Sequence, residues 1–218
     1  MQDLQGGENK NPIITFGSKT HIYTLNGEVV PSVTQMLDVL TYEDYGKIDK
    51  SVLEYASRRG TDVHEATMEY DLTDSTEVDA EIEPYVRAYA QFVADYKPNY
   101  FGIEKVVANE QYHYAGTVDR FGIMDGVQFV LDIKTIASPN RMTYIKTALQ
   151  TYLYEIAIGG DFGFVGSKLY VLFLRKDGTY RLVDLKEWWD KHMHEELYMS
   201  ALRIIRIKDL IKEIKEIN

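Results

Sequence analysis

Two aspartates and a lysine that could do chemistry lie close together in the segment 114–135. Asp125-Gly126 is the tight-turn dipeptide expected between two antiparallel strands, and Val-, Ile- and Phe-rich runs flank it. Residues equally far from this turn face each other, which places Asp119 opposite Asp132. Side chains alternate between the faces of a strand, so Lys134 shares the face of Asp132. We therefore expect two carboxylates and an ammonium to converge.

Like charges on neighbouring strands destabilise a sheet, so this cluster needs an explanation. A divalent cation supplies one, because Mg²⁺ takes hard oxygen ligands from carboxylates, waters and substrate phosphate. Lys134 could then bind a phosphate or activate a water. In the alternative interpretation, Asp119 only caps or ends a strand and Asp132 only pairs with Lys134. The spacing leaves both interpretations open.

The segments before the hairpin are predicted to be a small β-structure followed by helices. Asn26-Gly27 lies between short strands, and Ser32 could cap a helix to about residue 40. A helical pattern from Lys50 to Asp71 is expected to break at Gly60, with Thr61 as N-cap of a second helix that carries His64. A lone histidine is more often structural than a metal ligand. The next helix opens at Glu83-Pro84, and its apolar stripe is interpreted as a core face.

The segments after residue 97 are predicted to form a sheet that a helix crosses. Residues 103–108 begin the sheet, residues 140–158 form a helix, and residues 169–174 and 180–183 are strands joined around Asp177-Gly178. Gln150 and Tyr154 share one face of that helix. Leu185 to Ile217 is a long helical tract that could pack on the core, contact another subunit or fray.

These motifs together resemble a known family. AGTVD, LDIKT and QTYLY, with GTDVH at residues 60–64 and Glu104 upstream, are similar in order and spacing to the PD-(D/E)XK nuclease superfamily, particularly its RecB-like and phage exonuclease-like branch. The opening HIYTLNGEVVPSVTQML is similar to the opening of phage-encoded members. The resemblance implies an α/β fold with a restriction-endonuclease-like αβββαβ core, a central mixed β-sheet flanked by helices, and helical additions in the N-terminal half and at the C-terminus.

The resemblance also implies a metal site. Asp119 and Asp132 would hold Mg²⁺ or Mn²⁺, with His64 and the Ile133 carbonyl as further ligands. Imidazole suits Mn²⁺ as well as Mg²⁺. Glu104 would tune a metal-bound water or a second ion.

Three further residues gain roles from the resemblance. Lys134 would position or help deprotonate the attacking water, and Gln150 and Tyr154 would reach the lysine or the scissile phosphate. In the alternative interpretation, the Gln150–Tyr154 pair only fixes its helix against the sheet. Glu110 is the surface alternative to Glu104 at the upstream position.

The composition agrees with one domain that binds DNA locally. We expect a flexible arm at residues 1–12 and a single domain at 13–218, with the catalytic core at about 50–184 and a C-terminal helix at 185–217. The net charge of −10 argues against a nucleic-acid coat protein. However, residues 62–95 hold ten acidic side chains and one basic one, whereas residues 130–181 hold seven basic and four acidic ones.

The chain contains no cysteine, which excludes disulfides, Fe–S clusters and thiolate zinc sites. It shows neither a secretory signal nor a long apolar run, so we expect no membrane contact and a cytoplasmic protein, in the bacterial host if it is phage-encoded. The expected function is metal-dependent DNA hydrolysis, as an exonuclease of phage or bacterial DNA recombination, repair or processing.

The expected substrate is a single- or double-stranded DNA end, and the expected partners are a second copy of the chain or a recombination protein. Two alternatives remain open. One is a catalytically silent nuclease-like module that binds DNA or a recombination partner. The other is an interaction protein that uses its acidic segment and C-terminal helix.

Overall fold

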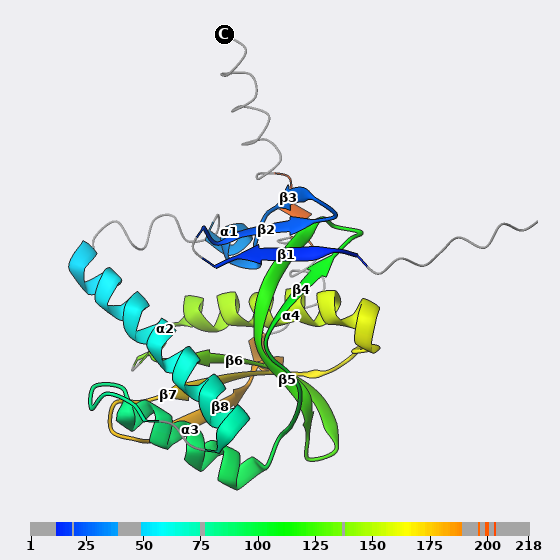
Figure 1. Ribbon diagram of the computed structural model, residues 1–218. Coiled ribbons are helices and arrows are strands. Elements are labelled where there is room, and N and C mark those ends of the chain that lie inside the picture. Colours follow the sequence, from blue (N-terminus) through cyan, green and yellow to red (C-terminus); the bar gives the residue numbers. More distant parts are fainter. Residues whose placement is uncertain are drawn as a thin grey trace, which may run out of the picture.

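The computed structural model describes residues 12–18, 20–38, 49–74, 77–136, 138–188, 196, 199–200 and 203, without the side chains of 160–162. A small three-stranded sheet lies beside a five-stranded sheet that has helices on both faces (Figure 1). Nearly all of the predicted arm at residues 1–12 and most of the predicted C-terminal helix lie outside the described residues. Where that helix was expected to begin, Leu185–Trp188 forms a short 3-10 helix, η2.

The small sheet is an antiparallel meander of β1 (Ile14–Gly17), β2 (Ile22–Leu25) and β3 (Glu28–Val30). Asn26 and Gly27 both have positive φ, as the predicted tight turn requires. The helix α1 (Val33–Asp38) follows, and the Ser32 hydroxyl accepts a hydrogen bond from the Gln35 N–H at 3.1 Å. The predicted cap is therefore confirmed.

The central sheet has the strand order β4-β5-β6-β7-β8. Its strands are β4 (Asn99–Asn109), β5 (Tyr114–Met124), β6 (Val127–Lys134), β7 (Lys168–Leu174) and β8 (Tyr180–Asp184). β6 and β7 pair in parallel, and the other neighbours pair antiparallel. The helix α4 (Arg141–Phe162) makes the crossover between the parallel strands. The mixed sheet with flanking helices confirms the predicted α/β fold class.

The β5–β6 hairpin has the register predicted from its turn. Met124 pairs with Val127, and the pairing continues to Arg120 and Leu131. Asp125 and Gly126 have φ values of 52° and 75°, which suit a two-residue turn whose twist matches that of the strands. The positions next beyond the last of these pairs are those of the two site aspartates.

One helix prediction is wrong: α2 (Lys50–Thr73) continues through Gly60 instead of breaking there. Asp49 caps its start, and the Thr61 hydroxyl donates to the Ser57 carbonyl within the helix at 3.3 Å, so Thr61 is not an N-cap. A mid-helix glycine costs only about 1 kcal/mol relative to alanine, which the burial of Val63 against the core can offset. His64 therefore projects from the middle of a long helix.

The alternation of side chains along the strands gives each sheet face its own core. Val130, Val171 and Phe173 pack toward α4, whereas Leu131 and Leu172 pack toward α2 and α3. The helix α3 (Glu83–Tyr96) starts at the predicted Glu83-Pro84 and buries its apolar stripe in the second core. In Figure 1, α4 lies on the opposite side of the sheet from α2 and α3. Among the described helices, none is long and apolar enough to cross a membrane.

Candidate metal-binding and catalytic site

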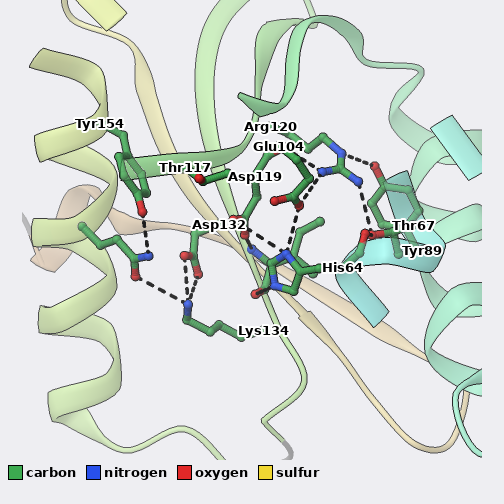
Figure 2. A network of polar contacts seen from close by, with 12 residues as sticks. His64, Thr67, Tyr89, Glu104, Thr117, Asp119, Arg120, Asp132, Lys134 and Tyr154 are labelled. Carbon is green, nitrogen blue, oxygen red and sulfur yellow. Dashed lines mark hydrogen bonds and ion pairs between the residues drawn. The ribbon is translucent and has the colours of Figure 1, made fainter. Parts of the chain in front are cut away.

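Three groups able to bind a metal ion meet where α2, β4 and β5 come together. The potential ligand atoms of His64, Glu104 and Asp119 all lie within 4.8 Å of one another. His64 Nδ1 is 3.0 Å from Glu104 Oε1 and 3.7 Å from Asp119 Oδ1. Figure 2 shows these side chains pointing toward one another. One imidazole nitrogen and two carboxylates form a donor set that suits Mg²⁺ or Mn²⁺.

Glu104 reaches the cluster through an unusual backbone conformation. The pairs Ile103–Arg120 and Lys105–Val118 lie on either side of it, so it is level with Asp119 on the neighbouring strand. Its φ of 43° is in the left-handed region. A non-glycine residue there costs about 1–3 kcal/mol and persists only where the surroundings hold it. Such strain is concentrated at functional sites.

His64 carries a proton on both ring nitrogens in this geometry. Nε2 faces the Ile133 carbonyl oxygen at 3.2 Å, and Nδ1 faces the Glu104 carboxylate, so both nitrogens must donate. Burial alone would lower the pKa of His64, but the negative charges of Asp119 and Glu104 outweigh it and raise this pKa to about 9. A metal that binds the ring must therefore displace a proton.

Asp119 is fixed by the strand on its other side. Its Oδ2 accepts a hydrogen bond from the Ile133 N–H at 2.7 Å, which leaves Oδ1 on the side of His64. The Ile133 carbonyl, predicted from the resemblance to be a metal ligand, accepts from His64 in this structure. The backbone of Ile133 thus contacts the side chains of both Asp119 and His64 at the end of the hairpin.

Asp132 and Lys134 lie on one face of β6, as predicted. The Lys134 Nζ donates to Asp132 Oδ1 at 2.9 Å and lies 2.8 Å from Oδ2. Oδ2 is buried and makes this ion contact, but it accepts no hydrogen bond within the described part of the chain. Burial raises the pKa of Asp132, and the lysine charge opposes that rise. The ion pairing foreseen as the alternative is present, and the metal role of Asp132 stays a prediction.

Gln150 and Tyr154 approach Lys134 from α4 through long hydrogen bonds. Lys134 Nζ lies 3.5 Å from Gln150 Oε1, and Gln150 Nε2 lies 3.4 Å from the Tyr154 hydroxyl. Gly116 explains part of the AGT motif, because a Cβ there would lie 2.7 Å from the Tyr154 ring. The structure therefore brings together the site residues selected from the sequence, while their roles remain predictions.

A buried arginine that was not predicted from the sequence lies behind the cluster. Arg120 is fully buried, and its Nη1 donates to Glu104 Oε1 at 3.0 Å. Its other partners are Asp71, Thr67, Tyr89 and the Asp119 carbonyl. A signal was available, because Arg120 is one position from Asp119 and so belongs on the opposite, apolar face of β5. A charge on that face requires a buried acidic partner.

Two other polar candidates lie outside the site. Glu110, the alternative to Glu104, accepts a hydrogen bond from the Asn26 side chain at 3.2 Å beside the small sheet. Tyr114, at the start of β5, is fully buried and donates to the Leu153 carbonyl at 2.7 Å. It is therefore a packing residue.

Comparison with known proteins adds a distant structural likeness. No protein-family model and no curated protein matches the chain. Among solved structures, an alkaline exonuclease (LHK-Exo) from Laribacter hongkongensis has a TM-score of 0.39 at 14% identity, over 87% of this chain and 95% of that chain. LHK-Exo in complex with dAMP has a TM-score of 0.32 at 16% identity, with the same coverage of both chains.

A third solved structure, SSO0001, has a TM-score of 0.34 at 14% identity, over 79% of this chain and 84% of that chain. Scores this low do not bear on function. The geometry of the site must therefore support any functional conclusion.

Proposed function

We propose that the chain is a divalent-metal-dependent nuclease that hydrolyses phosphodiester bonds in DNA. The observation that carries this proposal is the cluster of His64, Glu104 and Asp119, with ligand atoms within 4.8 Å of one another. The Asp132–Lys134 pair on the next strand lies beside this cluster (Figure 2). Carboxylates, an imidazole and a lysine at one point form a set suited to phosphoryl chemistry.

The side chains present fit a divalent metal ion. Glu104 and Asp119 offer oxygen ligands, and His64 offers a ring nitrogen once its proton is displaced. Asp132 Oδ2 is buried, and its close partner among the described residues is the Lys134 ammonium at 2.8 Å, so a cation is already held at this oxygen. Mg²⁺ or Mn²⁺ bound here would offset charge on the phosphoryl oxygens and lower the pKa of a bound water.

Lys134 is a cation of this set that can meet the substrate from the solvent side. Its side chain is 28% exposed, whereas that of its partner Asp132 is 1% exposed, so solvent reaches the lysine side chain but hardly the aspartate that pairs with it. Lys134 can donate to a phosphate oxygen or hold an attacking water in line. Gln150 and Tyr154 limit the positions that the ammonium can take.

Exonuclease action on a single- or double-stranded DNA end is the finer part of the proposal. It is supported by the resemblance of AGTVD, LDIKT and QTYLY to the phage exonuclease-like branch. On this proposal the protein acts in the bacterial cytoplasm in DNA recombination, repair or processing, alone, as a homo-oligomer or with a recombination protein. The alternative is a catalytically silent DNA-binding module, and the experiment must distinguish it from an active nuclease.

The test compares cleavage by the unmutated chain with cleavage by Lys134→Ala. End-labelled linear DNA, single- and double-stranded, and closed circular DNA are incubated with Mg²⁺, Mn²⁺ or EDTA. We expect metal-dependent loss of linear DNA and a rate lower by about 10²–10⁴-fold in Lys134→Ala, the usual contribution of a positioned proton-transfer group. Survival of the circle identifies an exonuclease.

The matched control is Lys176→Ala, which removes an exposed lysine in the β7–β8 turn. Its rate should equal that of the unmutated chain. If the unmutated chain binds Mn²⁺ and DNA but cuts neither form, the nuclease proposal is wrong and the silent module replaces it.

A further inference from the structure

We propose that Arg120 is a positioning residue of the metal centre, which holds Glu104 in its ligand conformation; this rests on the metal-dependent function proposed above. Arg120 is not a ligand, because its guanidinium cannot bind a cation. We expect Arg120 to affect metal affinity through the Glu104 carboxylate, which accepts its hydrogen bond. The support comes from its burial, its partners and the backbone of Glu104.

Arg120 uses its planar fork of donors to join four elements. Nε donates to Asp71 on α2 at 2.6 Å and to the Tyr89 hydroxyl on α3 at 3.2 Å. Nη1 donates to Glu104 on β4 at 3.0 Å and to the carbonyl of Asp119 on its own strand at 2.7 Å. A lysine could not reproduce this geometry, because it has one ammonium in place of the rigid fork.

The hydrogen bonds to Glu104 determine which of its carboxylate oxygens remains available to a metal ion. Oε1 receives both Arg120 Nη1 and His64 Nδ1, each at 3.0 Å. Within the described residues Oε2 accepts no hydrogen bond, so it is the oxygen left for a metal ion or its water. Partners behind a ligand commonly set metal affinity by fixing the ligand in this way.

The left-handed backbone of Glu104 makes this grip necessary. A residue with a φ of 43° inside a strand would relax toward extended backbone if nothing held it. Arg120 lies opposite Ile103, directly beside the strained residue, and its hydrogen bond to Oε1 opposes that relaxation. Without the guanidinium, we expect Glu104 to spend part of its time away from the site.

Asp71 in turn holds the arginine. Its side chain is 2% exposed, and its Oδ2 accepts both Arg120 Nε and the Tyr89 hydroxyl, the latter at 2.7 Å. Asp71 is on the same helix as His64, about two turns further along. The network thus connects the helix that supplies the imidazole to the strands that supply both carboxylates. Figure 2 shows a second link to this helix, from Arg120 to Thr67.

The experiment is a double-mutant cycle on Mn²⁺ affinity, measured by electron paramagnetic resonance without DNA. The variants are Arg120→Lys, Glu104→Gln and the double variant. We expect Arg120→Lys to raise the Mn²⁺ dissociation constant about 10–100-fold, the usual effect of losing a group behind a ligand. Glu104→Gln should weaken binding as well. The double variant should be no weaker than Glu104→Gln alone, because Arg120 acts through Glu104.

The matched control is Arg87→Lys, the same change at an exposed arginine that pairs with Glu83 on α3. It should leave Mn²⁺ affinity unchanged. If Arg120→Lys does not fold, the charge-balanced pair Asp71→Asn/Arg120→Gln replaces it with the same expectation. Thermal unfolding in EDTA identifies folded variants.

Three outcomes would overturn the inference: an Arg120 variant with unchanged affinity, a double variant weaker by the product of the single effects, or an unmutated chain that binds no Mn²⁺. The first two leave the nuclease proposal intact. A chain that binds Mn²⁺ but cuts no DNA refutes the nuclease proposal and leaves the cycle valid.

Discussion

The site has two halves that the fold holds in different ways. The triad half consists of His64, Glu104, Asp119 and Arg120, and the lysine half consists of Asp132, Lys134, Gln150 and Tyr154. In the triad half, hydrogen bonds of 2.6–3.2 Å surround a guanidinium with no exposed surface. In the lysine half, the Lys134 side chain is 28% exposed, and its link to α4 runs through contacts of 3.5 and 3.4 Å.

The difference indicates a division of work. Metal ligands gain from being fixed before the ion arrives, because a rigid site does not lose conformational freedom on binding. A lysine that meets a substrate must instead reach solvent and exchange its partner for a phosphate oxygen. We therefore expect the triad half to carry folding stability and the lysine half to cost some of it.

The largest expected effect comes from Arg120→Met. It should lower the free energy of unfolding in EDTA by about 3–5 kcal/mol, because Asp71 keeps a buried charge without its partner. Lys134→Met should cost less than half as much, since the Lys134 side chain is 28% exposed, whereas Arg120 is fully buried and donates to groups on four elements. Urea unfolding at neutral pH measures both. Equal losses would remove the contrast between the halves.

The next effect is a pH dependence due to His64. Its pKa is raised from 6.5 to about 9 in the folded protein. The protonated imidazole therefore stabilises the fold fully below the unfolded pKa, and this stabilisation is lost as the pH rises through about 9. The unfolding free energy in EDTA should fall by at most about 3 kcal/mol across this window. In His64→Gln the unfolding free energy should depend less on pH over this range. The control His21→Gln, at an exposed histidine, should keep the pH dependence of the unmutated chain.

The smallest effect, of opposite sign, is expected in the lysine half. Burial raises the pKa of Asp132, so the charged carboxylate destabilises the metal-free fold above its unfolded pKa. Asp132→Asn should therefore raise the free energy of unfolding in EDTA at pH 8 by about 1 kcal/mol. Lys134 can then turn to solvent. Asp125→Asn in the exposed turn is the control, and a destabilised Asp132→Asn would contradict the expectation.

Local rules in the sequence were sufficient for much of the fold. Asp125-Gly126 gave the hairpin register, and the alternation of side chains placed Lys134 beside Asp132. The helix break predicted at Gly60 is wrong, because helix propensity is a weak preference that packing of the surrounding helix overrides. The mixed sheet matched the fold that the motif resemblance implied.

The Arg120 network could not be derived in the same way. Asp71, Tyr89 and Glu104 come from three elements whose packing no local pattern specifies. Tyr89 belongs to the apolar stripe of α3, yet its hydroxyl donates to the buried Asp71. The left-handed conformation of Glu104 likewise depends on its partners and leaves no signal in residue type.

The parallel pairing of β6 with β7 sets an order of events during synthesis. The β5–β6 hairpin closes through a two-residue turn, but β7 can reach β6 only after α4 has crossed the sheet. A chain leaves the ribosome from its N-terminus, so the hairpin with both aspartates emerges well before β7, the strand that pairs with β6. Until residues 168–174 follow, one edge of β6 has no partner within this sheet. The nascent protein therefore carries its acidic hairpin for some time before the site is complete.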